Sequence, residues 1–365
     1  EFGLTTTRHK VAVYAYYFYR LLQRAEKICL VYNASPSAGG AGEMSRFMTQ
    51  LLVESPLVVT HHSMDFNLQS RQLFPQPIVK PAAWAEGMRR FSPSAINEYM
   101  RCQLLFFYNR VAKIKAPQKQ AVIIEPNVLG SVLHKTAELF YLDFVEHGNP
   151  VITPARLAPF LEPAADASLV FYVRRAMAEE QVGENVLVEQ IVKSFFKQLL
   201  RNDSKLETFK IKGLETPRAL TFNVLVNGAV RQVELCGIID RMDIVSDPTI
   251  NDGAETLRIV DYKTNGSMEQ ALSMDALFTP GEKHPHYVLQ TFLYALMVAP
   301  DVNSMPLMPT LFFVNKYGDK TFLPYIKYAN EPLTDFAPLA QDFKFRLEKL
   351  LSEMLDEATP FKPTK

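Results

Sequence analysis

The sequence lacks several features that would assign it to a specialised class of protein. No apolar run approaches the roughly 18 residues that a membrane-spanning helix needs, so we expect no membrane partner. The three cysteines, Cys29, Cys102 and Cys236, are odd in number and far apart, which argues against a disulfide framework and favours a reducing compartment, the cytoplasm. A phosphate-binding loop of the pattern Gly-x-x-x-x-Gly-Lys-Ser/Thr is also missing, which disfavours an ATP-driven motor.

Neither sign of charge is in excess. The 39 basic and 39 acidic residues give a formal net charge of zero, so any basic surface for nucleic acid must be local. An initiator Met and a signal peptide are absent, and the chain opens at Glu1-Phe2-Gly3, so we expect a fragment of a longer protein. With 365 residues, 48% of them hydrophobic, the chain can form two domains and bury a sizeable core.

Prolines divide the chain into two predicted domains. Hydrophobic periodicity fails from about His61, and Pro75, Pro77 and Pro81 lie close together, which is typical of a linker. A new unit begins near "FSPSAINEYM", where Ser92 is a helix N-cap and Pro93 takes the first helical position. The predicted division is residues 1–60, a linker over 61–90, and a second domain over 91–365.

Hydrophobic periodicity predicts the elements of both domains. In the first, we expect a helix over 11–26, a strand in "KICLVYN" and a helix in "GEMSRFMTQLLVE". In the second, we expect helices over 127–146, 154–181, 184–202, 285–299 and 333–357. Strands are expected in "ALTFNVLV" and "AVRQVELC", joined by a type I′ turn at Asn227-Gly228, and in "GIIDRMDIV" and "TLRIVDYK"; another hairpin is expected around 317–319.

Charged residues end two of these apolar strands. Strand side chains alternate, so in "RIVDYKTNG" Asp261 and Lys263 share a face while Tyr262 points the other way. The strand "GIIDRMDIV" places Asp240 near its own end, and strands that are neighbours in sequence usually pair, which brings Asp240 beside Asp261. Two carboxylates a few ångströms apart repel unless a cation lies between them, and their oxygens suit Mg²⁺ or Mn²⁺. Lys263 would then orient water or stabilise charge in a phosphorane-like transition state.

Each of these signals has a plainer interpretation when it stands alone. An isolated Asp-x-Lys is more often a surface ion pair, but Gly-x-x-Asp on the adjacent strand favours the metal site. His134 and Glu138 are four apart and therefore on one side of a helix, where a histidine is more often packed than bound to metal. Gln290 and Tyr294 are also four apart, and such a pair is usually helix surface.

Together, these residues resemble the RecB-like branch of the PD-(D/E)xK nuclease superfamily. The ordered set is Gly130 with His134, Gly237 with Asp240, Asp261 with Lys263, and Gln290 with Tyr294, and the resemblance covers about residues 91–365. It implies an α/β fold with a restriction-endonuclease-like core, a central mixed sheet flanked by helices, and helical insertions. It also implies metal-dependent hydrolysis of DNA. The implied metal ligands are His134, Asp240, Asp261 and the Tyr262 carbonyl; Lys263 is the implied catalytic lysine; Gln290, Tyr294, Glu138 and Asp243 are implied to contact DNA or support the site.

The N-terminal part resembles the last conserved motif of a superfamily 1 helicase. Leu22-Gln23-Arg24-Ala25 matches a Leu-Thr-Arg-Ala pattern that precedes a strand, with Gln in place of Thr. Arg24 matches the arginine that reaches an ATP phosphate. The combination resembles the C-terminal end of a helicase–nuclease subunit of the AddB type, which implies a role in DNA repair or recombination and a partner subunit.

Many nucleases of this branch hold a 4Fe-4S cluster on four cysteines. Cys102 matches the first of them, although Gln103 replaces the usual proline, and the chain stops at "TPFKPTK" without the other three. A cluster is therefore expected only in a longer chain, and the alternative is that Cys102 is a small packed residue.

We therefore predict a Mg²⁺-dependent DNA nuclease, an exonuclease, attached to a helicase-derived remnant. The alternative is a catalytically idle nuclease fold that serves as a DNA-binding or assembly subunit. The intact Asp240, Asp261 and Lys263 argue against an idle site. The sequence leaves open the polarity of cleavage, the strandedness of the DNA and the choice between exonuclease and endonuclease.

Overall fold

The chain forms two compact units, Glu1–Gln72 and Leu73–Lys365. The computed structural model describes residues 7–32, 44–62, 76–81, 84–87, 90–114, 126–183, 185–266, 270–302, 304–314 and 325–363. Within these ranges, none of the helices combines the length and apolar character needed to cross a bilayer. The hairpin expected around 317–319 lies outside the described residues.

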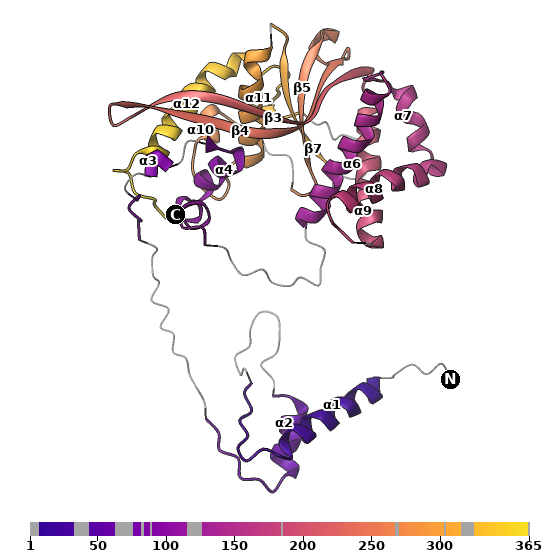
Figure 1. Cartoon of the computed structure of the whole chain (residues 1–365), viewed down its shortest axis with the longest axis vertical. Helices are drawn as coiled ribbons and strands as arrows, with labels where there is room; N and C mark the ends of the chain where they lie inside the picture. The colour runs from indigo at the N-terminus through magenta and orange to yellow at the C-terminus, as the bar shows by residue number, and fades with distance from the viewer. Residues whose placement is uncertain are drawn as a thin grey trace. The chain divides into compact units, whose positions relative to one another are not determined.

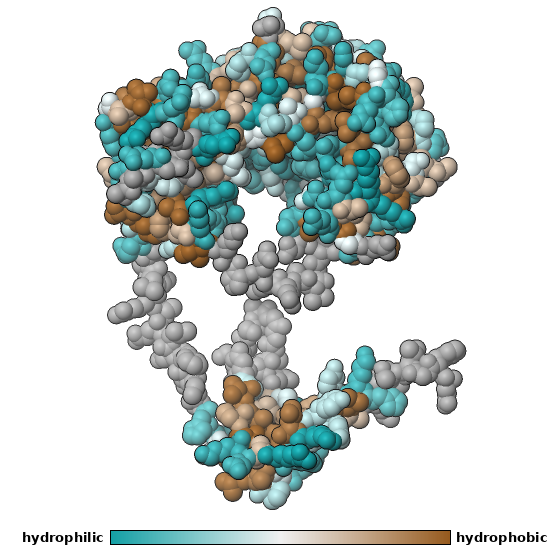
Figure 2. Space-filling model, in the orientation of Figure 1, coloured by the Kyte–Doolittle hydropathy of each residue, from teal (hydrophilic) through white to brown (hydrophobic). Residues whose placement is uncertain are grey.

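The described residues of the first unit form two helices, α1 (Thr7–Leu22) and α2 (Arg46–Glu54) (Figure 1). The side chain of Ser45 caps α2 by accepting a hydrogen bond from the Met48 N–H, and the Phe18 and Phe47 rings stack with centroids 5.6 Å apart. Large apolar side chains remain at the surface, as Figure 2 shows; Leu21 is 78% exposed and Val31 86%.

The strand predicted in "KICLVYN" is wrong. Residues 27–32 have no regular secondary structure. A strand needs a neighbour to satisfy its backbone N–H and C=O groups, and within the described part of this unit no strand is available to pair with it.

The second unit carries one central mixed sheet. Its strands are β1 (Arg90–Phe91), β2 (Val151–Ile152), β3 (Thr208–Val226), β4 (Ala229–Ser246), β5 (Thr256–Lys263) and β7 (Leu307–Phe313). Their order is β2-β3-β4-β5-β7, with β1 paired to β4. The pairs β2·β3, β3·β4 and β4·β5 are antiparallel, whereas β1·β4 and β5·β7 are parallel. A small second sheet contains β6 (Gln270–Ala271), β8 (Lys327–Tyr328) and β9 (Glu331–Pro332).

Helices pack against the sheet in two groups. The first group is α3 (Trp84–Gly87), α4 (Pro93–Arg101), α5 (Gln103–Phe106), α10 (Met274–Leu277), α11 (His286–Val298) and α12 (Ala337–Leu355). The second group is α6 (Pro126–Glu146), α7 (Pro154–Leu161), α8 (Asp166–Glu179) and α9 (Val186–Asp203). Short 3-10 turns lie at Pro163–Ala165, Asn251–Gly253 and Ala299–Asp301, and a π-helical segment at Phe107–Val111.

The two groups form two hydrophobic cores. Ile259 of β5 packs in the core with α4, α11 and α12, whereas its neighbours Val260 and Tyr262 contribute to the core with α6 to α9. This is the alternation that a strand buried on both faces requires. In Figure 1 the first helix group lies around the left and middle part of the β3–β4 hairpin, and α6 to α9 lie at its right-hand end. The fold is therefore α/β, with a central mixed sheet flanked by helices, as the sequence predicted.

The strands β3 and β4 form one long hairpin. Asn227 and Gly228 have φ of 50° and 80°, as the predicted type I′ turn requires. The register runs from Val226 opposite Ala229 to Thr208 opposite Ser246. The segments "AVRQVELC" and "GIIDRMDIV", which we expected as two strands, are therefore one strand, because no turn separates them.

A second difference concerns the predicted helix over 154–181. The structure has two helices here, α7 and α8, joined at a 3-10 turn that begins at Pro163. Proline disfavours helical backbone at the residue before it, and Glu162 is extended, with φ −63° and ψ 147°. Apolar periodicity continues across the break and conceals it.

Residues expected in the linker pack on the second unit. The Ile78 N–H donates to the Phe361 carbonyl (2.9 Å) and the Phe361 N–H donates back (2.8 Å). The indole N–H of Trp84, which is 8% exposed, donates to the Met354 carbonyl (2.8 Å), and the Lys80 ammonium donates to the Glu353 carbonyl (2.6 Å). These contacts hold the segment before β1 against the end of α12.

Candidate active site

The pairing of β4 with β5 brings Asp240 to Asp261. The antiparallel register places Arg241 opposite Val260. One step further along the ladder, the Tyr262 N–H donates to Asp240 Oδ2 (2.8 Å). Both carboxylates are buried, with residue exposures of 8% for Asp240 and 1% for Asp261. The predicted meeting of the two strands is confirmed.

Lys263, Asp261 and the α11 pair form one connected chain. Lys263 Nζ lies 2.6 Å from Asp261 Oδ2, so the two share a face of β5 as predicted, and it donates to Gln290 Oε1 (3.4 Å). The Gln290 amide donates to Asp261 Oδ1 (3.2 Å) and to the Tyr294 hydroxyl (3.1 Å). Gln290 therefore orients both the carboxylate and the ammonium, and Tyr294 supports Gln290.

His134 reaches the same place from α6. Its Nε2 donates to the Tyr262 carbonyl (3.1 Å), and its Nδ1 lies 3.4 Å from Asp240 Oδ2. Three of the residues that the family resemblance implied as ligands, His134, Asp240 and Tyr262, are thus in direct contact.

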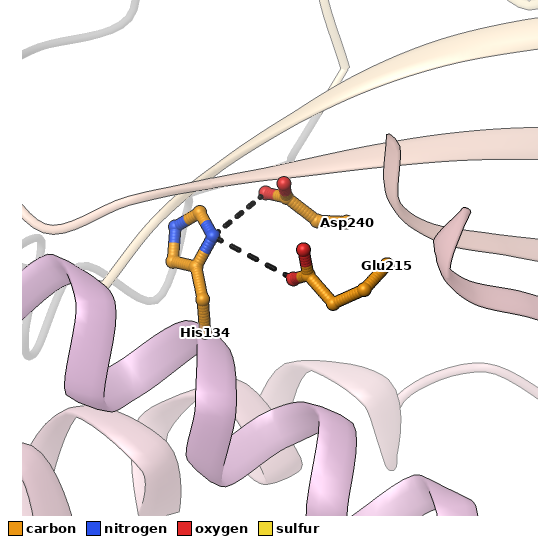
Figure 3. Close-up of side chains that lie close together, drawn as sticks. All are labelled: His134, Glu215 and Asp240. Atoms are coloured by element: carbon orange, nitrogen blue, oxygen red, sulfur yellow. Dashed lines mark ion pairs between the residues drawn. The ribbon is translucent and has the colours of Figure 1, made fainter. Parts of the chain in front are cut away.

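Glu215 is a residue that the sequence analysis missed. Its Oε1 lies 4.0 Å from His134 Nδ1, and Figure 3 shows it beside Asp240. Glu215 adopts φ of 41° within β3, just after the register of β3 and β4 shifts between Ile211 and Gly213. Gly213 and Pro217 around Glu215 in "KGLETP" are the signal that could have drawn attention to it, since both interrupt a strand pattern.

The ligand atoms of His134, Glu215 and Asp240 all lie within 4.8 Å of one another. Two ligands of one cation at about 2.0–2.6 Å from it lie at comparable separations, so this trio fits a single divalent ion. Asp261 is not part of the trio, because Lys263 and Gln290 hold its oxygens. Among the described residues, the group that could hold one ion therefore contains Glu215 together with His134 and Asp240.

Burial and mutual repulsion give the three acids different pKa values. Burial, reinforced by the charge of Asp240, raises the pKa of Glu215 to about 7. Burial also raises the pKa of Asp261 to about 6, against the opposing effect of Lys263. Burial disfavours the ionised form of Asp240 too, but His134, Lys263 and the Tyr262 N–H outweigh it and hold its pKa below the ordinary value.

The two cations of the site are stabilised by the same acids. Burial would lower the pKa of His134, but Asp240 outweighs burial, with help from Asp261 and Glu215, and the pKa rises to about 9. The pKa of Lys263 is likewise raised, because Asp261 and Asp240 overcome its burial. The ring of Tyr287 lies 5.3 Å from the ammonium. Lys263 is therefore a fixed positive charge beside the acids.

Glu138 and Asp243 lie around this centre in different ways. Glu138 borders a pocket of about 620 Å³ together with His134, Lys135 and Glu215, and it pairs with Lys135 at 2.9 Å. Asp243 is fully buried and forms a two-bond ion pair with Arg258 (2.8 Å for both bonds). No contact of Asp243 with the acids of the site occurs among the described residues, so it supports the strands rather than the ligands.

Cys102 is half-buried at the junction of α4 and α5 and packs against the first core. The neighbouring Gln103 side chain accepts from the Lys362 N–H (2.8 Å), so the "TPFKPTK" segment lies beside this junction. The expected iron–sulfur cluster of a longer chain stays a prediction.

Comparisons with known proteins agree with this geometry. No curated protein matches the chain. The family described as the PD-(D/E)XK nuclease superfamily matches residues 90–365, which include His134, Glu215, Asp240, Asp261 and Lys263. The match covers most of the chain, and the chain belongs to the PD-(D/E)XK nuclease superfamily.

Proposed function

We propose that this chain is a deoxyribonuclease that depends on Mg²⁺ or Mn²⁺. The observation that carries the proposal is the meeting of α6, β3, β4, β5 and α11 at one place, where three carboxylates, one imidazole and one lysine gather. The three carboxylates outnumber the two cationic side chains, His134 and Lys263, and burial raises the pKa values of Glu215 and Asp261 because it disfavours their ionised forms. A divalent cation would relieve this excess.

His134, Asp240 and Glu215 would hold the ion, with Asp261 and the Tyr262 carbonyl beside it. A bound divalent ion supplies positive charge to a phosphodiester and makes water more acidic. Lys263 stays protonated, and Asp261 and Gln290 hold it so that it presents its charge to a phosphate or orients an attacking water. Tyr294 and Gln290 keep this arrangement in place through their hydrogen bond.

We extend the proposal to the wider role that the sequence indicates. The chain would act as an exonuclease of a helicase–nuclease protein of the AddB type, in DNA repair or recombination, with a partner subunit and in the cytoplasm. The support is the ordered set of motifs in residues 90–365 and the Leu22-Gln23-Arg24-Ala25 stretch. We disfavour a catalytically idle subunit, because Asp240, Asp261 and Lys263 are all held in place by contacts within the site. A site without catalytic function would not need to position Lys263.

The test compares Asp240→Ala and Asp261→Ala with Asp342→Ala, a matched change at an exposed aspartate of α12 that pairs with Arg346. We expect cleavage of end-labelled DNA in Mg²⁺ to be lost in the first two variants and kept in the third. Calorimetry should show that Asp240→Ala no longer binds the ion. Full activity in EDTA or in Asp240→Ala would refute the proposal, and cleavage of circular single-stranded DNA would identify an endonuclease.

A further inference from the structure

An aromatic side chain of α11, Tyr287, lies beside the lysine of the site. Lys263 Nζ is over its ring, 5.3 Å from the centroid, which is within the range of a cation–π contact. Gln290, which accepts a hydrogen bond from the same ammonium, follows Tyr287 by three residues and so lies on the same face of α11. Two neighbouring side chains of one helix therefore contact Lys263, and the sequence analysis singled out only the second.

The ring of Tyr287 is itself held by two further elements. It packs edge-on against Phe313 of β7, with centroids 5.5 Å apart and planes at 74°. Phe313 is the partner of Lys263 in the parallel β5–β7 pairing, so the two side chains share a face of the sheet. The Tyr287 hydroxyl donates to the Asn265 carbonyl (3.4 Å), in the turn that follows β5. These contacts fix the ring between α11, β7 and the end of β5.

The turn after β5 comes close to this ring. Gly266 has φ of 98°, in the left-handed region that favours glycine. A Cβ at this position would lie 2.9 Å from Tyr287 Cε2 and 3.0 Å from its hydroxyl oxygen, so a larger residue would displace the ring. Gly237 of β4 meets Tyr294 in the same way, at 2.9 Å from Cε1. A glycine thus lets each tyrosine of α11 pack directly on the backbone around the site.

We propose that Tyr287 is a positioning residue: its ring face fixes the Lys263 ammonium for the reacting phosphate, and Gly266 keeps the ring in place. A carboxylate in this position would form a further ion pair and neutralise the ammonium. An aromatic ring attracts the ammonium and leaves its charge available to a phosphate. The inference rests on the proposed nuclease function, because it assigns a role within the same site.

Steady-state cleavage of end-labelled DNA by the full chain in saturating Mg²⁺ tests this role. Tyr287→Leu removes the ring, and we expect kcat to fall by about tenfold to a hundredfold, as for a reacting group displaced by up to about 1 Å, while KM and metal affinity stay near the natural values. Tyr287→Phe retains the ring and should restore kcat. Tyr328→Leu is the control, because Tyr328 is also half-buried against the first core but packs on Phe292.

A second variant acts on the ring without altering it. Gly266→Ala should also lower kcat, because the added Cβ displaces the ring of Tyr287. If both changes act through Lys263, the double variant Gly266→Ala/Tyr287→Leu should lose no more than the more damaging single change, whereas independent effects would multiply. Multiplied losses would remove Gly266 from the assignment. A kcat of Tyr287→Leu equal to that of Tyr328→Leu would overturn the role of the ring.

Nuclear magnetic resonance separates this inference from the proposed function. In the metal-free chain with isotope-labelled lysine, the ring current of Tyr287 should shift the ammonium signal of Lys263, which Lys263→Met identifies by its loss. That signal should move in Tyr287→Leu and stay in place in Tyr287→Phe. If it does so but no DNA is cut in Mg²⁺, the contact stands and the nuclease function fails. If DNA is cut and the signal does not move in Tyr287→Leu, the positioning role fails alone.

Discussion

Lys263 is the side chain whose chemistry can be separated from metal binding. It contacts Asp261 and Gln290 and is not one of the trio of ligands. We expect Lys263→Met to slow cleavage by a factor equivalent to about 2.7–4 kcal/mol, as for the loss of one preorganised electrostatic group. Metal affinity, measured by calorimetry, should stay near that of the natural chain. If Lys263→Met lost metal affinity but kept its cleavage rate, Lys263 would be a metal ligand and not a catalytic group.

Metal uptake should release protons. Near pH 7 the metal-free site holds a proton on His134, whose pKa is raised to about 9, and about half a proton on Glu215, whose pKa is raised to about 7. The ion must displace both, so its apparent affinity should increase as the pH rises through 7. Calorimetry in two buffers of different ionisation enthalpy measures the number released. Glu215→Gln should release fewer protons and bind the ion more weakly; an unchanged count would remove Glu215 from the site.

The same shift has a consequence for stability without metal. The pKa of Glu215 is higher in the folded state, about 7, than its ordinary 4.5, so the folded chain binds more protons between these values. The stability that Glu215 contributes is therefore complete below about pH 4.5 and is lost as the pH rises through about 7. Thermal melts in EDTA should show this decline, and Glu215→Gln should reduce it.

Some residues of the site can be predicted from the sequence and others cannot. Asp240, Asp261 and Lys263 follow from strand alternation and from the pairing of neighbouring strands, both of which are local rules. Glu215 cannot be predicted in this way, because its position depends on a register shift in β3 and on its own positive φ. Such irregularities are set by packing between strands, and the sequence pattern does not reveal them.

A buried ion cluster joins the elements behind the site. Arg241 of β4 forms two bonds with Asp203 at the end of α9 (2.7 and 2.9 Å) and contacts Asp243 at 2.9 Å, and Arg258 of β5 also pairs with Asp243. The Tyr141 hydroxyl of α6 donates to Asp203. This cluster fixes α6, and hence His134, relative to the strands that carry the acids.

Asp203→Ala should destabilise the second unit by about 3–5 kcal/mol, because it removes the carboxylate that accepts two hydrogen bonds from the buried Arg241. Urea unfolding can follow this unit through Trp84, the only tryptophan in the sequence and a buried residue of the unit. Asp166→Ala, at an exposed aspartate paired with Lys193 and Lys197, is the control and should change stability far less. A cost for Asp203→Ala no larger than for Asp166→Ala would show that the cluster contributes nothing.

The pKa of Asp203 lies below its ordinary value: burial opposes ionisation, but Arg241 outweighs it. A carboxylate with a lowered folded-state pKa stabilises the fold above its unfolded pKa, and this contribution disappears as the pH falls through the folded value. The difference in unfolding free energy between the natural chain and Asp203→Ala should therefore shrink below about pH 4. A difference that stayed constant into strong acid would contradict the assignment.

Helices and strands follow from the sequence where a turn signal marks their ends, and they do not where the hydrophobic pattern continues across a break. The type I′ turn at Asn227-Gly228 marks the β3–β4 hairpin unambiguously, because both residues must adopt positive φ. The break at Pro163 was missed, because apolar positions continue on both sides of it. The ion cluster was not visible either, since Asp203, Arg241 and Arg258 come from separate segments and look like ordinary surface charges.

Residues 73–365 hold every residue of the candidate active site, and they form one compact unit. We expect this fragment to cleave DNA without residues 1–72. A fragment that begins at residue 91, the predicted domain boundary, should melt at a lower temperature, because it loses the Ile78–Phe361 pairing and the buried Trp84. Circular dichroism of the two fragments measures the difference. Equal melting temperatures would place residues 76–87 outside the folded unit.

The β3–β4 hairpin sets the order in which the cleavage machinery is completed during synthesis. A nascent chain that has emerged only as far as β4 already carries His134, Glu215 and Asp240, and hairpin contacts form quickly because they close a short loop. Lys263 and Gln290 leave the ribosome later, on β5 and α11. With the proposed roles of these residues, the growing polypeptide would gain its cation-binding groups before its catalytic lysine, so it would hold a cation before it could cut nucleic acid.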